Sequence, residues 1–255
     1  MINVKKSWDK IAILYKNRYD ISREIVHYGP LCPGEDKLGL MGDIRGKKVV
    51  DLGCGGGQNA VALNKMGAEV MGIDFSSEQI ILARKLADDC GSSIMFKSAD
   101  ISSLPFLGDA SRDLAISACA VSFVENIDRF FSETFRILKS GGRFILSDMN
   151  PLQYVLDETE DGMVFNNPYF QKTLPLNWSW EFDELPRVTR FRHYVRPVTQ
   201  YHNSLVDAGF VTKKILEPDP TPDTPHRGFS DEIMEEYSYI ASHIPITFII
   251  VCEKP

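Results

Sequence analysis

The sequence predicts an α/β fold, in which a mostly parallel β-sheet is covered by helices on both faces. Three observations lead to this prediction. Strand patterns and helix patterns alternate from residue 47 to about residue 150, the loops between them are short, and the first strand runs directly into a glycine-rich turn. Repeated β-α-β units with short connections form a parallel sheet between two layers of helices.

Length and composition exclude several classes of protein. The chain has 255 residues, of which 44% are hydrophobic and 25% charged, values that are typical of a globular domain with its own core. The net charge of −7 argues against a broad surface for nucleic acid. The five cysteines form no CxxC pair and no metal-ligand cluster, so we expect reduced thiols, no metal site and a cytoplasmic protein.

No segment predicts a membrane anchor. The N-terminus lacks the apolar run of a signal peptide, and the longest late apolar stretch, Ile246–Cys252, has seven residues. A helix that spans a bilayer needs about 20. We therefore expect one elaborated domain, a monomer or a homodimer, whose partners include neither membranes nor nucleic acid.

A helical cap is expected over residues 1–44. Within it, residues 5–30 carry apolar side chains at spacings of three and four, which is the pattern of an amphipathic helix, and Trp8 is expected in the core. The segment 29–34 contains two glycines and two prolines, which end the helix in a loop.

The sheet core is expected over residues 45–150. Each strand there is a short apolar run, each helix shows helical spacing of its apolar side chains, and Ser76 and Ser77 are suited to cap one of the helices. The expected strands are Lys48–Leu52, Glu69–Ile73, Ile94–Lys97, Leu114–Ser117 and Arg143–Ser147, and the expected helices are Gln58–Met66, Ser77–Asp88 and Ile127–Leu138.

The pattern changes after residue 150. Residues 151–196 are rich in aromatic side chains and show no β-α alternation, so we expect an inserted lid. Residues 197–255 are expected to hold the final helices and a strand hairpin, with a proline-rich surface loop at 217–225. The expected helices are Val198–Ala208 and Asp231–Tyr239, and the expected strands are Phe210–Leu216 and Ile246–Cys252.

The glycine-rich turn carries the strongest chemical signal. It lies in Val49–Gln58, between a buried strand and the start of a helix. Glycines permit positive φ angles and a close approach of a ligand to the backbone, and a helix N-terminus offers unpaired N–H groups. The next strand ends at Asp74, 21 residues after Gly53, where a carboxylate can bind the two hydroxyls of a ribose. This order predicts a nucleotide-like ligand.

The charge near the turn indicates which kind of nucleotide-like ligand would bind there. Asp51 lies two residues before the first glycine and would repel a pyrophosphate, and Gln58 stands where the dinucleotide pattern G-x-G-x-x-G has its third glycine. A carboxylate at this place suits a ligand with an ammonium or sulfonium group. S-adenosylmethionine (AdoMet) has both, and its ribose suits Asp74.

The segment Val49–Gln58 resembles motif I of the class I AdoMet-dependent methyltransferases, in its D-x-G-x-G-x-G form. The resemblance extends over about residues 45–150 and is to the small-molecule enzymes of the ubiquinone-biosynthesis type. It implies a Rossmann-like sheet of seven strands whose last strand is antiparallel. The other segments that resemble family motifs are Gly72–Ser76, Ser98–Ile101, Leu104–Phe106, Asp113–Val121 and Leu138–Leu146.

The resemblance also implies a cofactor site for AdoMet, with S-adenosylhomocysteine as the product. The methionine part would be lined by the turn, the ribose bound by Asp74, and the adenine bordered by the segment after the third strand. Two tyrosines of the N-terminal cap would close over the cofactor or simply pack. The expected residues are Asp51, Gly53, Cys54, Gly55, Gly57, Asp74, Phe75, Asp100, Ile101, Ala118, Tyr15 and Tyr28.

Methyl transfer is an in-line displacement that needs alignment and exclusion of water, and it needs a general base only if the acceptor atom carries a proton. His27 and His193 are the best candidate bases, because histidine accepts a proton near neutral pH, although a structural role or a binding contact is the more common one for a histidine in either place. The acceptor would lie against the cap and the lid, and the candidate contacts are Tyr19, Tyr154, Tyr169, Trp178 and Arg196.

The sequence therefore predicts an AdoMet-dependent methyltransferase that acts on a small molecule. One alternative is a non-catalytic AdoMet-binding regulatory protein. Another is a nicotinamide-dependent oxidoreductase, which Asp51 and Gln58 disfavour. The stretch Ser117–Ala120 lacks the Asn-Pro-Pro-Tyr type of motif, which weakens methylation of nucleic acids or glutamine. The identity of the acceptor and the methylated atom stay open.

Overall fold

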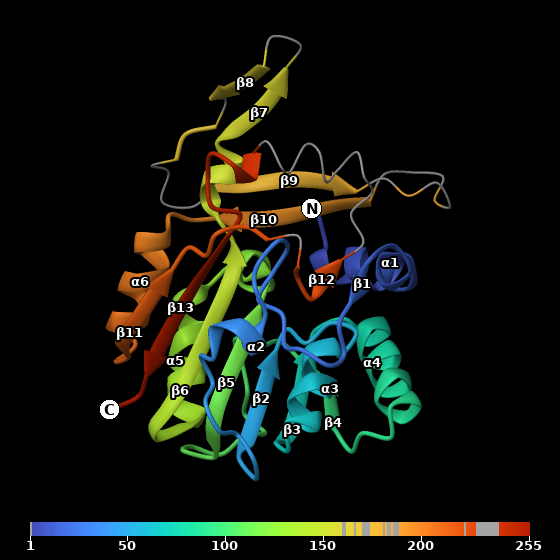
Figure 1. Cartoon of the computed structure of the whole chain (residues 1–255), viewed down its shortest axis with the longest axis vertical. Coiled ribbons are helices and arrows are strands. Elements are labelled where there is room, and N and C mark those ends of the chain that lie inside the picture. The colour runs from blue at the N-terminus through green and yellow to red at the C-terminus, as the bar shows by residue number, and fades with distance from the viewer. Residues whose placement is uncertain are drawn as a thin grey trace.

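A seven-stranded sheet forms the centre of the molecule (Figure 1). The computed structural model describes residues 2–159, 162–165, 167–169, 174–180, 182, 185, 189–221, 223–227 and 240–255. Across the sheet, the strand order is β11 (Val211–Leu216), β13 (Thr247–Glu253), β6 (Leu138–Met149), β5 (Arg112–Ala118), β2 (Lys48–Leu52), β3 (Glu69–Asp74) and β4 (Met95–Ser98).

The last strand of the chain is the one that is reversed. Strand β13 lies between β6 and β11 and is antiparallel to both, whereas β6, β5, β2, β3 and β4 pair in parallel. The Rossmann-like sheet expected from the sequence is thereby confirmed. The strand order reverses between β2 and β5, and open α/β sheets bind ligands beyond the carboxyl ends of the strands at such a point.

Helices cover both faces of the sheet (Figure 1). Successive strand residues point to opposite faces, so Val49 packs with α3 (Gln58–Lys65) and α4 (Ser77–Asp89), while Val50 packs with α5 (Ile127–Ile137) and α6 (Val198–Asp207). Two apolar layers result, one on each side of the sheet, and together they hold the carboxyl ends of the strands in place.

The expected N-terminal helix over residues 5–30 is wrong in its length. Helix α1 covers Val4–Arg18, and β1 (Asp20–Ile21) follows it and pairs with β12 (His226–Arg227). The N–H of Ser22 also donates to the carbonyl of Pro225 at 2.8 Å. Hydrogen bonds to residues from the far end of the chain thus replace the hydrogen bonds of a helix here. The spacing of apolar residues within one segment cannot predict such distant partners.

The segment after β6 contains regular β-structure, which its lack of β-α alternation did not predict. It begins with the short helix η2 (Pro151–Tyr154), followed by the antiparallel pair β7 (Leu156–Thr159) and β8 (Gly162–Phe165) and the antiparallel pair β9 (Leu174–Trp180) and β10 (Thr189–Val195). These are hairpins, whose strands need only each other. The expected helix at Asp231–Tyr239 lies outside the described residues.

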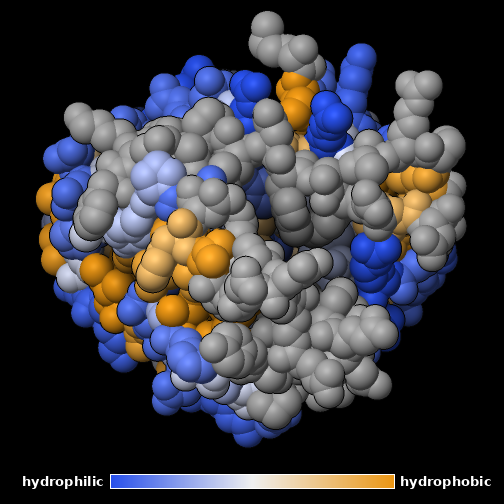
Figure 2. All heavy atoms as spheres, turned by 90° about the horizontal axis from the view of Figure 1, so that it is seen from above, coloured by the Kyte–Doolittle hydropathy of each residue, from blue (hydrophilic) through white to orange (hydrophobic). Residues whose placement is uncertain are grey.

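The β9–β10 pair and α1 lie over the carboxyl ends of the sheet strands, and the β7–β8 hairpin projects beyond them (Figure 1). A view onto this end shows hydrophobic atoms gathered on one side among hydrophilic ones (Figure 2). We call α1 together with β9 and β10 the lid. None of the helices in the described part of the chain has the length and apolar character that a membrane crossing requires.

Candidate functional site

The glycine-rich turn leaves the end of β2 and enters α3 with three left-handed residues. Gly53, Gly55 and Gly57 have φ angles of +82°, +50° and +85°. A Cβ at Gly53 would lie 2.3 Å from the Cβ of Ala120, whereas a Cβ at Gly55 would meet nothing within 4 Å. Gly53 is therefore required by packing, and Gly55 borders open space that a ligand can fill.

Asp74 holds the turn from the neighbouring strand. One carboxylate oxygen, Oδ2, accepts a hydrogen bond from the N–H of Gly55 at 3.0 Å, and Oδ1 accepts one from the N–H of Ser76 at 2.8 Å. Burial raises the pKa of Asp74 to about 6. Its carboxylate thus orders the turn and also faces the space above it.

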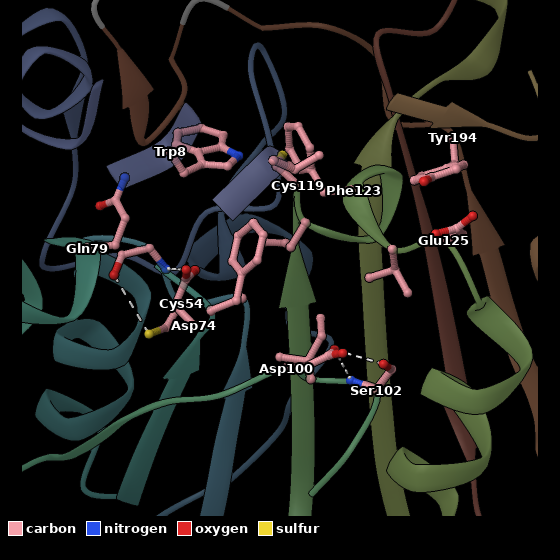
Figure 3. A pocket seen from close by; sticks show the side chains of 18 of the residues that line it. Trp8, Cys54, Asp74, Gln79, Asp100, Ser102, Cys119, Phe123, Glu125 and Tyr194 are labelled. Atoms are coloured by element: carbon pink, nitrogen blue, oxygen red, sulfur yellow. Dashed lines mark hydrogen bonds between the residues drawn. The ribbon is translucent and has the colours of Figure 1, made fainter. Parts of the chain in front are cut away.

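A cavity of about 910 Å³ opens over the turn, beneath the lid. Ligand pockets commonly measure about 300–1,000 Å³, so this one is at the upper end of the range. In Figure 3, Asp74, Asp100, Trp8 and Phe123 surround the space from the sheet and from the lid. The turn, the ends of three strands and the lid therefore converge on one site.

Asp51 lies behind the turn with 2% of its surface exposed. Its Oδ2 is buried and has no hydrogen-bond partner among the residues that the structure describes. Burial, and secondly the negative charge of Asp74, raise the pKa of Asp51 to about 7. A buried carboxylate of this kind is costly unless a positive group compensates it, so the residues present fit a cationic ligand such as AdoMet.

The loop after β4 forms another wall. Asp100 Oδ1 accepts hydrogen bonds from the N–H of Ser102 at 2.8 Å and from its hydroxyl at 2.7 Å. Asp100 and Ile101 both line the cavity, as do Phe75 and Gln79. This arrangement gives the mixture of polar edge and apolar surface that a purine requires.

The segment after β5 contributes more of the cavity than the sequence indicated. Ala118 lines it as expected, and so do Cys119, Ala120 and Phe123. Cys119 has a φ of +54°, a conformation that is uncommon outside glycine and that clusters at functional sites. The available signal was position, because these residues follow a parallel strand at its carboxyl end. The further lining residues from this region are Val124, Glu125, Asn126, Ile127, Asp128 and Arg129.

Aromatic rings close the cavity from the lid. The centroid of the Trp8 ring lies 5.2 Å from the ring centroid of Tyr15, 5.4 Å from that of Phe123 and 5.3 Å from that of Phe191. All three are edge-to-face contacts. Trp8 packs against the small core of Ile11, Phe182 and Phe191, as expected, and it also lines the cavity.

Most of the expected cofactor residues line this cavity. They are Gly53, Cys54, Gly55, Asp74, Phe75, Asp100, Ile101, Ala118 and Tyr15. Asp51 and Gly57 lie behind its wall. Tyr28 does not reach it, because its buried hydroxyl donates to Glu35 Oε2 at 2.6 Å.

The residues expected to bind the acceptor are more scattered. Arg196 lines the cavity, but its guanidinium donates to the carbonyls of Tyr194, Val124 and Glu125. The ring of Tyr19 packs at a tilt against that of Tyr15, with ring centroids 4.6 Å apart, and Tyr19 lies outside the cavity wall. Tyr154 and Tyr169 also lie outside the wall, and the side chain of Trp178 is not among those described.

The two candidate bases differ in position. His27 lines the cavity, and burial lowers its pKa to about 4. His193 is buried behind Phe123, with ring centroids 4.4 Å apart, and its Nδ1 lies 3.3 Å from the hydroxyl of Tyr154. His226, which sequence reasoning missed, lines the cavity beside His27. No group of three potential metal ligands occurs among the described residues.

Comparison with known proteins identifies the domain around this cavity. Residues 50–146 match the family model of a methyltransferase domain. The chain is 29% identical over 161 residues to the demethylmenaquinone methyltransferase of Thermus thermophilus, which covers 62% of this chain and 70% of that protein. The matches to several other curated relatives cover about half or less of the length of those proteins.

The fold is similar to that of an S-adenosylmethionine-dependent methyltransferase from Mesorhizobium loti, with a TM-score of 0.64 and 23% identity over 85% of this chain and 95% of that one. It is also similar to that of the [4+2]-cyclase SpnF, with a TM-score of 0.65 and 20% identity over 100% and 97% of the two chains. Likeness at this level concerns the fold. The family model and the curated relatives agree on the part of the chain that holds the motif-bearing turn, and residues 50–146 are similar to a methyltransferase domain.

Proposed function

We propose that this chain transfers a methyl group from AdoMet to a small molecule in the cavity between the sheet and the lid. The observation that carries the proposal is the pair of buried carboxylates, Asp51 and Asp74, at a glycine turn that borders open space. A nucleotide with a pyrophosphate would be repelled there, whereas a cationic nucleoside would be attracted.

Each wall of the cavity would hold one part of the cofactor. The turn at Gly53–Gly55 would lie along the methionine part, Asp74 would bind the ribose hydroxyls, and Asp100 and Ile101 would border the adenine. When bound, AdoMet supplies an electrophilic methyl group on a sulfonium. The residues of this chain would orient the two reactants and exclude water, which is most of what an in-line displacement requires.

A small acceptor fits the shape and charge of the site. The cavity lies beneath aromatic rings of the lid, and the chain carries a net charge of −7. A nucleic acid would require an open, basic surface instead. The Thermus relative named a demethylmenaquinone methyltransferase supports a small-molecule acceptor. We also infer a cytoplasmic location from the five free cysteines.

Titration calorimetry tests the cofactor. AdoMet and S-adenosylhomocysteine should bind the wild type, and NAD should not. Asp74→Ala should weaken both by about 10- to 100-fold, because hydrogen bonds to a charged group contribute about 1.5–3 kcal/mol. Asp89→Ala, which removes an exposed carboxylate at the end of α4, is the matched control and should bind normally. Tight binding of NAD without binding of AdoMet would favour an oxidoreductase.

Incubation with AdoMet and a metabolite extract tests the reaction. The wild type should release S-adenosylhomocysteine, and Asp74→Ala should release much less. Release that is equal in both proteins would contradict the assigned site. Binding of AdoMet with no release from any extract would favour the non-catalytic regulatory protein.

A further inference from the structure

Two histidines from opposite ends of the chain meet in the cavity wall. The rings of His27 and His226 lie 5.0 Å apart between centroids, at an interplanar angle of 52°. Both side chains are at least nine-tenths buried, and both line the cavity together with Tyr15 and Ile21. Two polar rings in an otherwise aromatic and apolar part of the wall require an explanation.

His27 is held in place by the helix that follows the glycine turn. Its N–H donates to Asn59 Oδ1 at 2.8 Å, and Asn59 Nδ2 donates to its carbonyl at 3.0 Å. Asn59 is the second residue of α3 and is itself buried. The backbone that carries the imidazole is thereby fixed relative to the turn along which the methionine part of the cofactor would lie.

His226 is held by the pairing of β12 with β1, in which it faces Ile21. Its N–H donates to Thr224 Oγ1 at 3.2 Å, and the Thr224 hydroxyl donates to the carbonyl of Cys32 at 2.9 Å. The second imidazole is therefore placed by backbone and threonine contacts, independently of Asn59.

The environment keeps both rings uncharged. Burial lowers the pKa of His27 to about 4, and burial together with the neighbouring His27 lowers the pKa of His226 well below its ordinary value. A neutral imidazole offers one N–H donor and one nitrogen lone pair. Nδ1 of His27 is buried without a hydrogen-bond partner among the described residues, so it is available to a ligand.

Each cationic side chain in the cavity wall either donates its hydrogen bonds within the protein or is exposed to solvent. The guanidinium of Arg196 donates to three backbone carbonyls, and Arg129 is exposed to solvent. No lysine lines the cavity among the described residues. This part of the site is consequently suited to an uncharged ligand rather than to a carboxylate or a phosphate.

Resting on the methyl transfer proposed above, we propose that His27 and His226 form the polar end of the acceptor site and select a flat, uncharged acceptor that carries a hydroxyl group. The rings of Trp8, Tyr15 and Phe123 would pack on its faces, and an imidazole nitrogen would accept a hydrogen bond from its O–H. The hydroxyl would then be the methylated group.

The step balances in atoms and charge. A lone pair of the acceptor oxygen forms the new O–CH3 bond while the C–S bond breaks, and its electron pair stays on sulfur in S-adenosylhomocysteine. The hydroxyl proton moves to the imidazole nitrogen and from there to solvent. Because the sulfonium charge disappears as the imidazolium forms, the closed site keeps its net charge, which allows even a buried imidazole to accept the proton.

Three probes with one ring system test the selection. 2-Naphthol donates a hydrogen bond, 2-methoxynaphthalene cannot donate, and 2-naphthoate carries a charge. Titrated into protein saturated with S-adenosylhomocysteine, 2-naphthol should bind about 5- to 150-fold more tightly than the other two, since a buried acceptor nitrogen left without its donor costs about 1–3 kcal/mol. Equal binding of all three, or preference for the naphthoate, would overturn the proposal.

Variants assign the preference to the histidines. His226→Leu and His27→Leu should lose the preference for 2-naphthol, whereas His226→Gln and His27→Gln, which keep an acceptor atom, should retain it within about threefold. With 2-naphthol as the methyl acceptor, the Gln variants should lose kcat by at least tenfold at nearly unchanged KM, because glutamine takes no proton. Leu variants that keep the preference, or Gln variants with normal kcat, would contradict the proposal.

Binding of S-adenosylhomocysteine separates this inference from the proposed function. It should be normal in all four variants and in His243→Gln, which changes an exposed histidine outside the cavity wall. If the wild type fails to bind S-adenosylhomocysteine, both the proposed function and this inference are wrong. If it binds but does not distinguish the three probes, only the inference about the histidines is wrong.

Discussion

Asp51 sits at the end of β2 with a buried carboxylate oxygen that nothing in the described chain contacts by a hydrogen bond. In the unfolded chain this group ionises near its ordinary pKa of 3.8, but in the folded protein its pKa is raised to about 7. The folded state therefore binds a proton that the unfolded state releases. The stability of the ligand-free protein must fall as the pH rises through this window, and this loss ends above pH 7.

Asp51→Asn removes this loss. At pH 8, the ligand-free variant should be more stable than the wild type by up to about 4 kcal/mol, which is three pKa units at about 1.4 kcal/mol each. The advantage should shrink as the pH is lowered from 7 to 5, and AdoMet should bind the variant more weakly. Thermal unfolding as a function of pH, with calorimetry of AdoMet, measures both. A variant that is less stable at every pH would show that Asp51 has a structural partner.

Gly53 and Gly55 both have left-handed backbone, yet their surroundings differ. Gly53→Ala should destabilise the fold by at least about 1–3 kcal/mol, because the new methyl would lie 2.3 Å from the Cβ of Ala120 at a φ of +82°. Gly55→Ala should fold with a smaller loss and bind AdoMet poorly, since its methyl enters the open space. Chemical denaturation and calorimetry separate the two effects. Equal stability losses with equal affinities would contradict this division.

Among the elements, the end of β10 and the segment after β5 are joined by the side chain of Arg196, the residue that directly follows β10. The guanidinium of Arg196, 2% exposed, donates to the carbonyls of Val124 and Glu125 at 2.8 and 2.7 Å and to that of Tyr194 at 2.9 Å. The lid is also attached at its other side, where Asp9 of α1 accepts a hydrogen bond from the hydroxyl of Ser76 at 2.7 Å. Both attachments hold the lid over the cavity.

Arg196→Met should lower the free energy of unfolding by about 3–5 kcal/mol, because it removes three hydrogen bonds and leaves one buried and two part-buried carbonyls without their donor. The acceptor site should also loosen, so that KM for the acceptor rises more than the Kd of AdoMet. Arg190→Met is the matched control, since Arg190 is exposed on β10, the strand that Arg196 directly follows. Urea denaturation provides the measurement. If both variants are equally stable, the three hydrogen bonds do not hold the lid.

At the level of the whole chain, the cavity draws its walls from the sheet, the loops and both parts of the lid, so a ligand there contacts segments from residue 2 to residue 226. A ligand that binds the folded state alone stabilises all of these segments together. At 100 times its Kd, it adds about 2.7 kcal/mol.

S-adenosylhomocysteine at this concentration should therefore raise the Tm by about 5–11 °C, given about 2–4 °C per kcal/mol for a domain of this size. Differential scanning fluorimetry measures the shift, with Asp74→Ala as the control that should show about half of it or less at the same concentration. A shift as large in the variant would mean that the ligand binds elsewhere. NAD should leave the Tm of both proteins unchanged.

Short-range patterns were enough to predict the sheet and the turn. Apolar runs, helical spacing, caps and glycines act over a few residues, so the strands from Lys48 to Ser147 and the last strand were located within a few residues of their places. The wall proposed for the cofactor was predicted from the same signals, because parallel strands bring their carboxyl ends to one edge. The helix predicted over residues 5–30 was wrong beyond Arg18, because the backbone after that residue pairs with β12 instead of continuing the helix.

The acceptor end of the cavity depends instead on contacts between distant parts of the chain. His226 meets His27 only because β12 pairs with β1, and Arg196 reaches the segment after β5 only because β10 crosses the end of the sheet. Such neighbours are selected by packing and by buried hydrogen bonds summed over the whole fold, and no spacing along the chain encodes them. Local sequence thus specifies where the cofactor would bind, and long-range packing specifies what would receive the methyl group.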